Sequence, residues 1–134
     1  MGVQLTKNAF DLGIVVTDID RALGFYRDFL GFPVENKMPF SKTTTLHFLK
    51  AGDANVKLWE VTEPPAPTDA GFPLEAALGF RYITFSVSNL DEVAAAAEGA
   101  GVTTLVPATD LMPGVKICIL ADPDGNAVEL VQRG

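Results

Sequence analysis

One structural pattern occurs twice in the chain, and this repeat restricts the fold more than any other feature of the sequence. The stretch "DLGIVVTDID" at residues 11–20 aligns with "YITFSVSNLD" at residues 82–91. Further along each half, "LHFL" at residues 46–49 aligns with "ICIL" at residues 117–120. The 134 residues are therefore predicted to form two copies of one structural unit.

The first copy begins with a strand that leads into a helix. Leu12, Ile14 and Val16 alternate with other residues, which is typical of a strand with one buried face. Asp18 is a suitable N-cap for the helix. Apolar residues then recur at helical spacing until Gly31, which is typical of a helix C-terminus.

The second copy repeats this order. Its helix is predicted to begin after Ser88 or Asn89 and to end at Gly99 and Gly101. Three extended segments follow the helix in each copy, at residues 33–40, 44–50 and 55–61 and at residues 102–108, 114–120 and 126–132. Each copy therefore has the order βαβββ, which predicts an α+β fold.

The two copies are predicted to lie within one domain, residues 1–134. Module one covers residues 8–61 and module two covers residues 80–134. The connector over residues 62–79 begins with "TEPPAPTDAGFP", which is too rich in Pro for a helix or a central strand.

Charge and composition restrict the partners. The net charge is −7 and the basic residues are scattered. Proteins that bind nucleic acids or anionic membranes do so through clustered Lys and Arg, so these two partners are not expected. No apolar run approaches the roughly 18 residues of a membrane span. The single cysteine, Cys118, allows no internal disulfide and fits a reducing, cytoplasmic location. A small molecule is the expected partner.

Two motifs resemble those of the vicinal oxygen chelate superfamily, which includes glyoxalase I, extradiol dioxygenases and bleomycin resistance proteins. One is V-x-D-x6-F-Y-x3-L-G, at Val16, Asp18, Phe25, Tyr26, Leu30 and Gly31. The other is D-P-D-G-N-x-x-E-L, at residues 122–130. The resemblance implies two βαβββ modules that form a curved mixed sheet around a ligand cup, and a homodimer.

The resemblance also implies four metal-ligand positions, usually occupied by His or Glu. These positions match Asp11, Lys57, Tyr82 and Glu129, so only Glu129 is the expected residue. Because an ammonium group cannot ligate a divalent cation, no cofactor is favoured. A metal held by Glu129 and Asp11 is the alternative.

Strand alternation predicts which side chains face the cup. The predicted set is Asp11, Gly13, Val15, Thr45, His47, Leu49, Lys57, Trp59, Tyr82, Thr84, Ser86, Lys116, Cys118, Ala127, Glu129 and Val131. The apolar residues between them, including Leu46, Phe48, Ile117 and Ile119, are predicted to face the helices. Ionisable and aromatic residues in mid-strand favour a ligand site over a purely structural core.

The favoured function is a lyase, isomerase or epimerase that acts on a small carbonyl compound by proton transfer. Glu129, with Asp11 or His47, would remove a proton beside the carbonyl. Lys57 and Tyr82 would stabilise the enolate oxygen that develops. The alternative for His47 is a structural histidine bonded to a backbone carbonyl.

The alternative function is a sequestering protein without catalysis, similar to bleomycin resistance proteins. Its ligand would be a planar compound held by Trp59, Tyr82, Phe40 and Met112. A scaffold with a vestigial cup is a third interpretation. The turn over residues 122–125 is predicted to carry its acidic side chains as surface caps.

Overall fold

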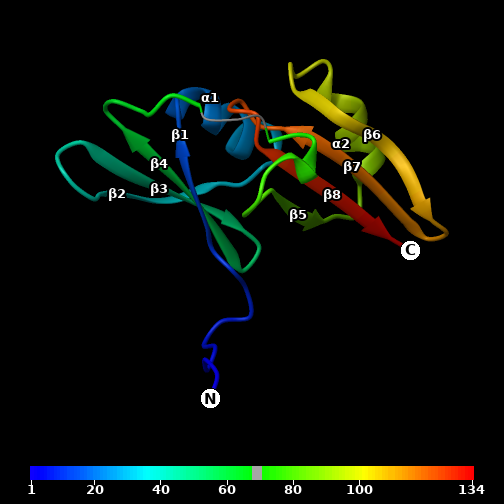
Figure 1. Ribbon diagram of the computed structural model, residues 1–134, viewed down its shortest axis with the longest axis horizontal. Helices are drawn as coiled ribbons and strands as arrows, with labels where there is room; N and C mark the ends of the chain where they lie inside the picture. The colour runs from blue at the N-terminus through cyan, green and yellow to red at the C-terminus, as the bar shows by residue number, and fades with distance from the viewer. Residues whose placement is uncertain (68–70) are drawn as a thin grey trace. The chain divides into compact units, whose positions relative to one another are not determined.

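The computed structural model describes residues 1–67 and 71–134, and this part of the chain has an α+β fold with eight strands. The chain divides into two compact units, Met1–Ala66 and Pro67–Gly134. Each unit contains one four-stranded mixed sheet and one α-helix (Figure 1). The prediction of one domain with a connector over residues 62–79 stays a prediction.

The first unit follows the predicted βαβββ order. Its elements are β1 (Leu12–Val16), α1 (Ile19–Leu23), a π-helical turn η1 (Gly24–Phe29), β2 (Val34–Pro39), β3 (Thr44–Ala51) and β4 (Ala54–Val61). The strand order in the sheet is β1-β4-β3-β2, with β1 parallel to β4 and the other pairs antiparallel.

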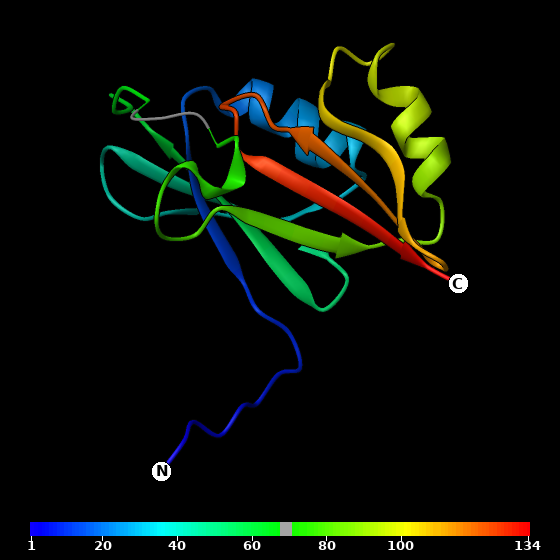
Figure 2. The same cartoon turned by 45° about the vertical axis from the view of Figure 1, so that its right-hand side comes forward.

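The second unit has the same topology. After a short 3₁₀ turn, η2 (Leu74–Ala76), come β5 (Tyr82–Ser86), α2 (Leu90–Ala97), β6 (Thr103–Met112), β7 (Val115–Ala121) and β8 (Ala127–Arg133). The strand order is β5-β8-β7-β6, and α2 lies against β6, β7 and β8 (Figure 2). The predicted α+β fold of two modules is confirmed.

The two helices begin in different ways. The Asp18 carboxylate accepts hydrogen bonds from the backbone N–H groups of Asp20 and Arg21, as predicted for an N-cap. Asn89 occupies the N-cap position of α2 but makes no side-chain cap bond. Instead the Gln132 side-chain oxygen, from β8, accepts a bond of 2.9 Å from the backbone N–H of Leu90. The start of α2 is therefore stabilised by its own sheet.

The register of the β3–β4 hairpin corrects the predicted faces of β3. His47 is paired with Leu58 and Leu49 with Val56, whereas Phe48 is paired with Lys57. Paired residues on neighbouring strands point to the same side of a sheet. His47 and Leu49 therefore lie on the same face as Leu58, and the prediction that they share a face with Lys57 is wrong.

The same correction applies to β7 in the second unit. Cys118 is paired with Leu130, and Lys116 is paired with Gln132, the residue that caps α2. These side chains face α2. Ile119 is paired with Glu129, so it joins the opposite face. The predicted positions of Lys116, Cys118 and the two isoleucines of β7 are wrong.

The core of each unit consists of the apolar side chains on the helix-facing side of its sheet, together with those that its helical segments bury. The largest fully buried ones are Tyr26, Leu49, Leu58, Leu90, Leu120, Leu130, Val56 and Val128. Phe25 and Tyr26 are 4% and 1% exposed and pack edge to face, with ring centroids 4.8 Å apart, so both are core residues. In the part of the chain that the structure describes, no helix is long and apolar enough to cross a membrane.

The turn between β7 and β8 is more than a surface turn. Gly125 has a φ of 89°, which suits a turn, but Asp122 is only 5% exposed. Its carboxylate accepts bonds from the backbone N–H groups of Asp124 (3.0 Å) and Asn126 (2.8 Å), and from Asn126 Nδ2 (2.9 Å). The prediction that Asp122 is a surface cap is wrong, because this carboxylate is the buried centre of the turn.

Candidate functional site

The first unit carries an aromatic surface on one side of its sheet, which we call the Trp59 face; its residues are Gly13, Val15, Met38, Phe40, Leu46, Phe48, Lys57 and Trp59. The rings of Trp59 and Phe40 are in contact, with centroids 5.0 Å apart and planes tilted by 57°. A Cβ on Gly13 would lie 3.4 Å from the indole nitrogen, so Gly13 leaves the space that the indole occupies. Phe40 is 62% exposed and Val15 is 52% exposed. Trp59 is half-buried and Leu46 is buried, so the accessible part of this face, which we call the platform, is formed by Phe40, Val15 and the open part of the indole.

A charged cluster lies beside the platform. Lys57 Nζ is 3.7 Å from Asp11 Oδ2 and 5.6 Å from the centroid of the Phe48 ring. Asp11 Oδ1 accepts hydrogen bonds from Lys7 Nζ at 2.7 Å and from the backbone N–H of Asn55 at 2.9 Å. Two ammonium groups thus share one carboxylate, and the cluster has a net charge of +1.

The contacts of Asp11 make it a poor base. The hydrogen bond from Lys7 and then that from the Asn55 backbone lower the pKa of Asp11 from 3.8 to about 2. A general base works best when its pKa is near the operating pH. The predicted role of Asp11 as a proton acceptor therefore has no support in its surroundings.

The pKa of Asp11 can be tested directly. Since its pKa in the folded protein is below the ordinary value, the contacts of Asp11 stabilise the fold above about pH 4. That contribution is lost as the pH falls toward 2. We expect Lys7→Met to raise the pKa of Asp11 toward its ordinary value, measured by NMR titration of the carboxyl carbon. Lys42→Met, at an exposed lysine, should leave it near 2. An unchanged pKa in Lys7→Met would contradict the assignment.

The second unit has its own polar face, which we call the Glu129 face; its residues are Tyr82, Thr84, Ser86, Ile117, Ile119 and Glu129. The Thr84 hydroxyl donates a hydrogen bond of 2.7 Å to Glu129 Oε1. Tyr82 is exposed, and Met112, which is paired with Val115, is exposed as well. Glu129 is partly buried and is oriented by Thr84.

His47 lies away from the Trp59 face. It is 6% exposed, and its Nε2 is 2.9 Å from Glu60 Oε1. The alternative interpretation was a structural histidine bonded to a backbone carbonyl; His47 is buried, and the partner of its Nε2 is the Glu60 carboxylate. A small molecule on the Trp59 face would meet Lys57 but not His47.

The donor set of the first unit does not fit the divalent metal that the resemblance implies. One matching position is the ammonium group of Lys57, and the carboxylate at the other, Asp11, already accepts bonds from Lys7 and Asn55. Among the residues that the structure describes, no three His, Cys, Asp or Glu residues gather closely enough to hold a metal ion.

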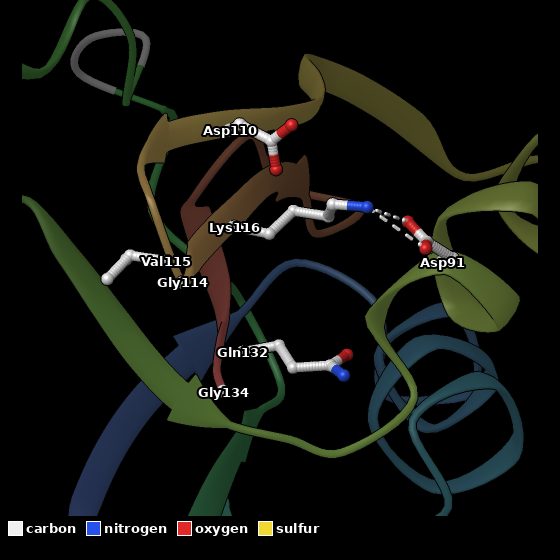
Figure 3. Close-up of a pocket in the computed structure, with 7 residues that line it drawn as sticks. All are labelled: Asp91, Asp110, Gly114, Val115, Lys116, Gln132 and Gly134. Atoms are coloured by element: carbon white, nitrogen blue, oxygen red, sulfur yellow. Dashed lines mark hydrogen bonds and ion pairs between the residues drawn. The ribbon is translucent and has the colours of Figure 1, made fainter.

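A cavity of about 240 Å³ opens in the second unit, on the side of the sheet that faces α2 (Figure 3). Its polar side chains include Asp91, Asp110, Lys116 and Gln132. Lys116 Nζ bonds both oxygens of Asp91, at 3.2 and 3.1 Å, and Gln132 caps α2. Lys116 and Gln132 connect the sheet to its helix. Lys116 was predicted to face the cup, but none of the residues predicted to have a catalytic or ligand-binding role lines this cavity.

Two βαβββ units, each with polar and aromatic side chains in mid-strand, form the architecture of a class of small-molecule enzymes and binding proteins. The sequence pattern of the Glyoxalase/Bleomycin resistance protein/Dioxygenase superfamily matches residues 9–130. The chain belongs to this superfamily, whose members bind small molecules.

Solved structures share the fold. A glyoxalase family protein from Bacillus cereus has a TM-score of 0.82 at 18% identity, over 98% of this chain and 96% of that one. The trypanothione-dependent glyoxalase I of Leishmania major has a TM-score of 0.72 at 24% identity, over 91% and 84%. TnmS3, an antibiotic-binding protein from Streptomyces, has a TM-score of 0.70 at 20% identity, over 100% and 99%. These identities support a common fold and do not decide between catalysis and binding.

Proposed function

We propose that this protein binds a small planar organic molecule on the Trp59 face and does so without a divalent metal. The observation that carries the proposal is the contact between the exposed Phe40 ring and the half-buried Trp59 indole, next to Lys57. The resemblance implies a metal ligand at the position of Lys57. Aromatic side chains provide a large contact area for a flat ligand. The similarity in fold to an antibiotic-binding protein is consistent with this role.

The surroundings of the predicted proton acceptors favour binding over catalysis. His47 is buried against Glu60, and the pKa of Asp11 is held at about 2 by Lys7 and Asn55. The third group predicted to accept a proton is Glu129, which is partly buried and is oriented by the Thr84 hydroxyl. It remains the candidate for a general base.

A ligand screen tests this function. We expect saturation-transfer NMR against a library of planar compounds to give signals that are lost in Trp59→Ala, because the platform is removed. The signals should persist in Leu111→Ala, which removes an exposed apolar side chain of β6, outside the platform. Binding should be unchanged by EDTA. Signals that survive in Trp59→Ala would place the ligand elsewhere, and signals lost in EDTA would contradict metal independence.

One observation favours the second candidate, a lyase, isomerase or epimerase for a small carbonyl compound. The Thr84 hydroxyl orients Glu129 through a bond of 2.7 Å, as a positioned general base requires. If the ligands found by the screen are converted to product, and Glu129→Gln abolishes conversion but not binding, the enzyme is the better description.

We also propose that the protein is a homodimer. Leu78 and Phe80 are fully exposed and lie two residues apart, and contiguous exposed apolar patches are typical of interaction surfaces. Light scattering that reports a monomer at micromolar concentration would overturn this. The cytoplasmic location stays a prediction from Cys118.

A further inference from the structure

We infer that the ligand of the Trp59 face is a planar aromatic anion, such as an aryl carboxylate, with its ring on Trp59 and its negative group on Lys57. This inference rests on the proposed function, and it names the chemical class that the site prefers. It is carried by the charge balance of the face and by the spacing of two side chains on one strand.

The charge balance favours an anion. The chain as a whole has a charge of −7, yet the cluster beside the platform, formed by Lys7, Lys57 and Asp11, has a net charge of +1. The one acidic residue of β4, Glu60, is bonded to His47 on the opposite face. The positive charge of this cluster would therefore attract an anionic ligand, although the protein as a whole is acidic.

Asp11 does not saturate the Lys57 ammonium group. Asp11 Oδ1 accepts from Lys7 and Asn55 at 2.7 and 2.9 Å, whereas Oδ2 is 3.7 Å from Lys57 Nζ. A distance of 3.7 Å is an ion pair but is too long for a hydrogen bond. The N–H groups of Lys57 can therefore donate to a ligand carboxylate, which makes stronger hydrogen bonds than a neutral oxygen does.

Two neighbours hold Lys57 in place. Its ammonium group lies 5.6 Å from the Phe48 ring centroid, within the range of a cation–π interaction. Asp11 attracts it from the β1 side of the sheet. The ammonium group is thus positioned on the Trp59 face and is partly exposed, at 32%.

The spacing matches a flat acid. Lys57 and Trp59 are two residues apart on β4 and point to the same side, so their Cα atoms are about 7 Å apart. A fused aromatic ring stacked on the indole can carry a carboxylate that reaches Lys57. A neutral analogue keeps the stacking but loses the charge-assisted hydrogen bond, which corresponds to about a tenfold or greater loss of affinity.

The single tryptophan makes the site directly observable, because ¹⁵N-labelled protein gives one indole N–H resonance, that of Trp59. We would titrate it with 2-naphthoate, 2-naphthalenemethanol and 2-naphthylmethylammonium, which differ mainly in charge. The inference predicts that naphthoate binds about tenfold or more tightly than the alcohol, and that the ammonium compound binds most weakly. In Lys57→Met this preference should disappear. In Lys50→Met, at an exposed lysine, it should remain.

The contrary outcomes are distinct. If all three compounds shift the Trp59 resonance with equal affinity, or the cation binds best, the inference on charge is wrong and the proposed binding face stands. If naphthoate is preferred equally in Lys57→Met, another group recognises the anion. If none of the compounds shifts the resonance, the proposed function itself fails. Unchanged dispersion of the remaining amide resonances shows that each variant is folded.

Discussion

Replacing Asp122 by alanine is expected to lower the free energy of unfolding by about 2–4 kcal/mol. The carboxylate is 5% exposed and accepts hydrogen bonds from the backbones of Asp124 and Asn126 and from the Asn126 side chain. Without it, these donors lose a buried charged acceptor. The turn between β7 and β8 then keeps its backbone bonds, such as that from the Gly125 N–H to the Asp122 carbonyl oxygen (2.9 Å), but the N–H groups of Asp124 and Asn126 lose the carboxylate.

Urea denaturation followed by circular dichroism measures this effect. Asp122→Asn keeps one acceptor oxygen and should show a smaller loss than Asp122→Ala. Asp110→Ala removes an exposed carboxylate from β6 and should change the free energy of unfolding by less than about 0.5 kcal/mol. Equal effects of Asp122→Ala and Asp110→Ala would show that the turn does not depend on the buried carboxylate.

The contacts of this turn give the D-P-D-G-N motif a structural role. The motif therefore identifies the fold better than it identifies the reaction or ligand of the protein. Asp122 and Gly125 set the path of the chain into β8, and therefore the position of Glu129. Gly71 adds a second constraint, because a Cβ at this residue would lie 2.5 Å from the Gly125 carbonyl oxygen. The motif can persist for structural reasons in proteins whose metal ligands differ.

The edge strands β1 and β5 were predictable from sequence because their two faces differ in character. Leu12 and Ile14 are partly buried while Val15 is exposed, and Tyr82 and Thr84 are exposed in the same alternating way. Alternation carries information where one face is apolar and the other is not. The order of elements and the Asp18 cap followed from equally local signals, and the repeat was visible by comparing the two halves of the sequence.

The middle strands β3 and β7 were not predictable by alternation, because residues 46–49 and 117–120 are mostly apolar on both faces. Their faces depend on register, and a shift of one residue exchanges the two faces of a strand. The two-residue turn between Ala51 and Ala54 fixes the register of β3 against β4. Counting outward from this turn pairs His47 with Leu58, and would have placed the histidine correctly.

The contacts of the candidate site required long-range pairing that local sequence does not contain. Thr84 and Glu129 are hydrogen-bonded although they are 45 residues apart in the sequence. The bond from Asn55 to Asp11 joins residues 44 positions apart. The identities of Lys57, Trp59 and Glu129 were visible in the sequence, whereas their partners depend on the sheet that assembles around them.

The corrected faces of β3 lead to a second large effect. Leu49 is 0% exposed and lies among the core side chains beside Val56, so Leu49→Ala should lower the free energy of unfolding by about 2–5 kcal/mol. Leu49→Glu should prevent folding, since it would bury a carboxylate without a partner.

Phe48 is the adjacent residue and serves as the matched control. It points to the Trp59 face, where the Lys57 ammonium group lies 5.6 Å from its ring, so a carboxylate in its place gains a cationic neighbour. We expect Phe48→Glu to remain folded, with a loss of about 1–2 kcal/mol from the missing ring contacts. Thermal and urea denaturation of the Leu49 and Phe48 variants compares the two faces directly. The opposite order, with Phe48→Glu unfolded and Leu49→Glu folded, would mean that the hairpin register is shifted by one residue and that His47 shares a face with Lys57.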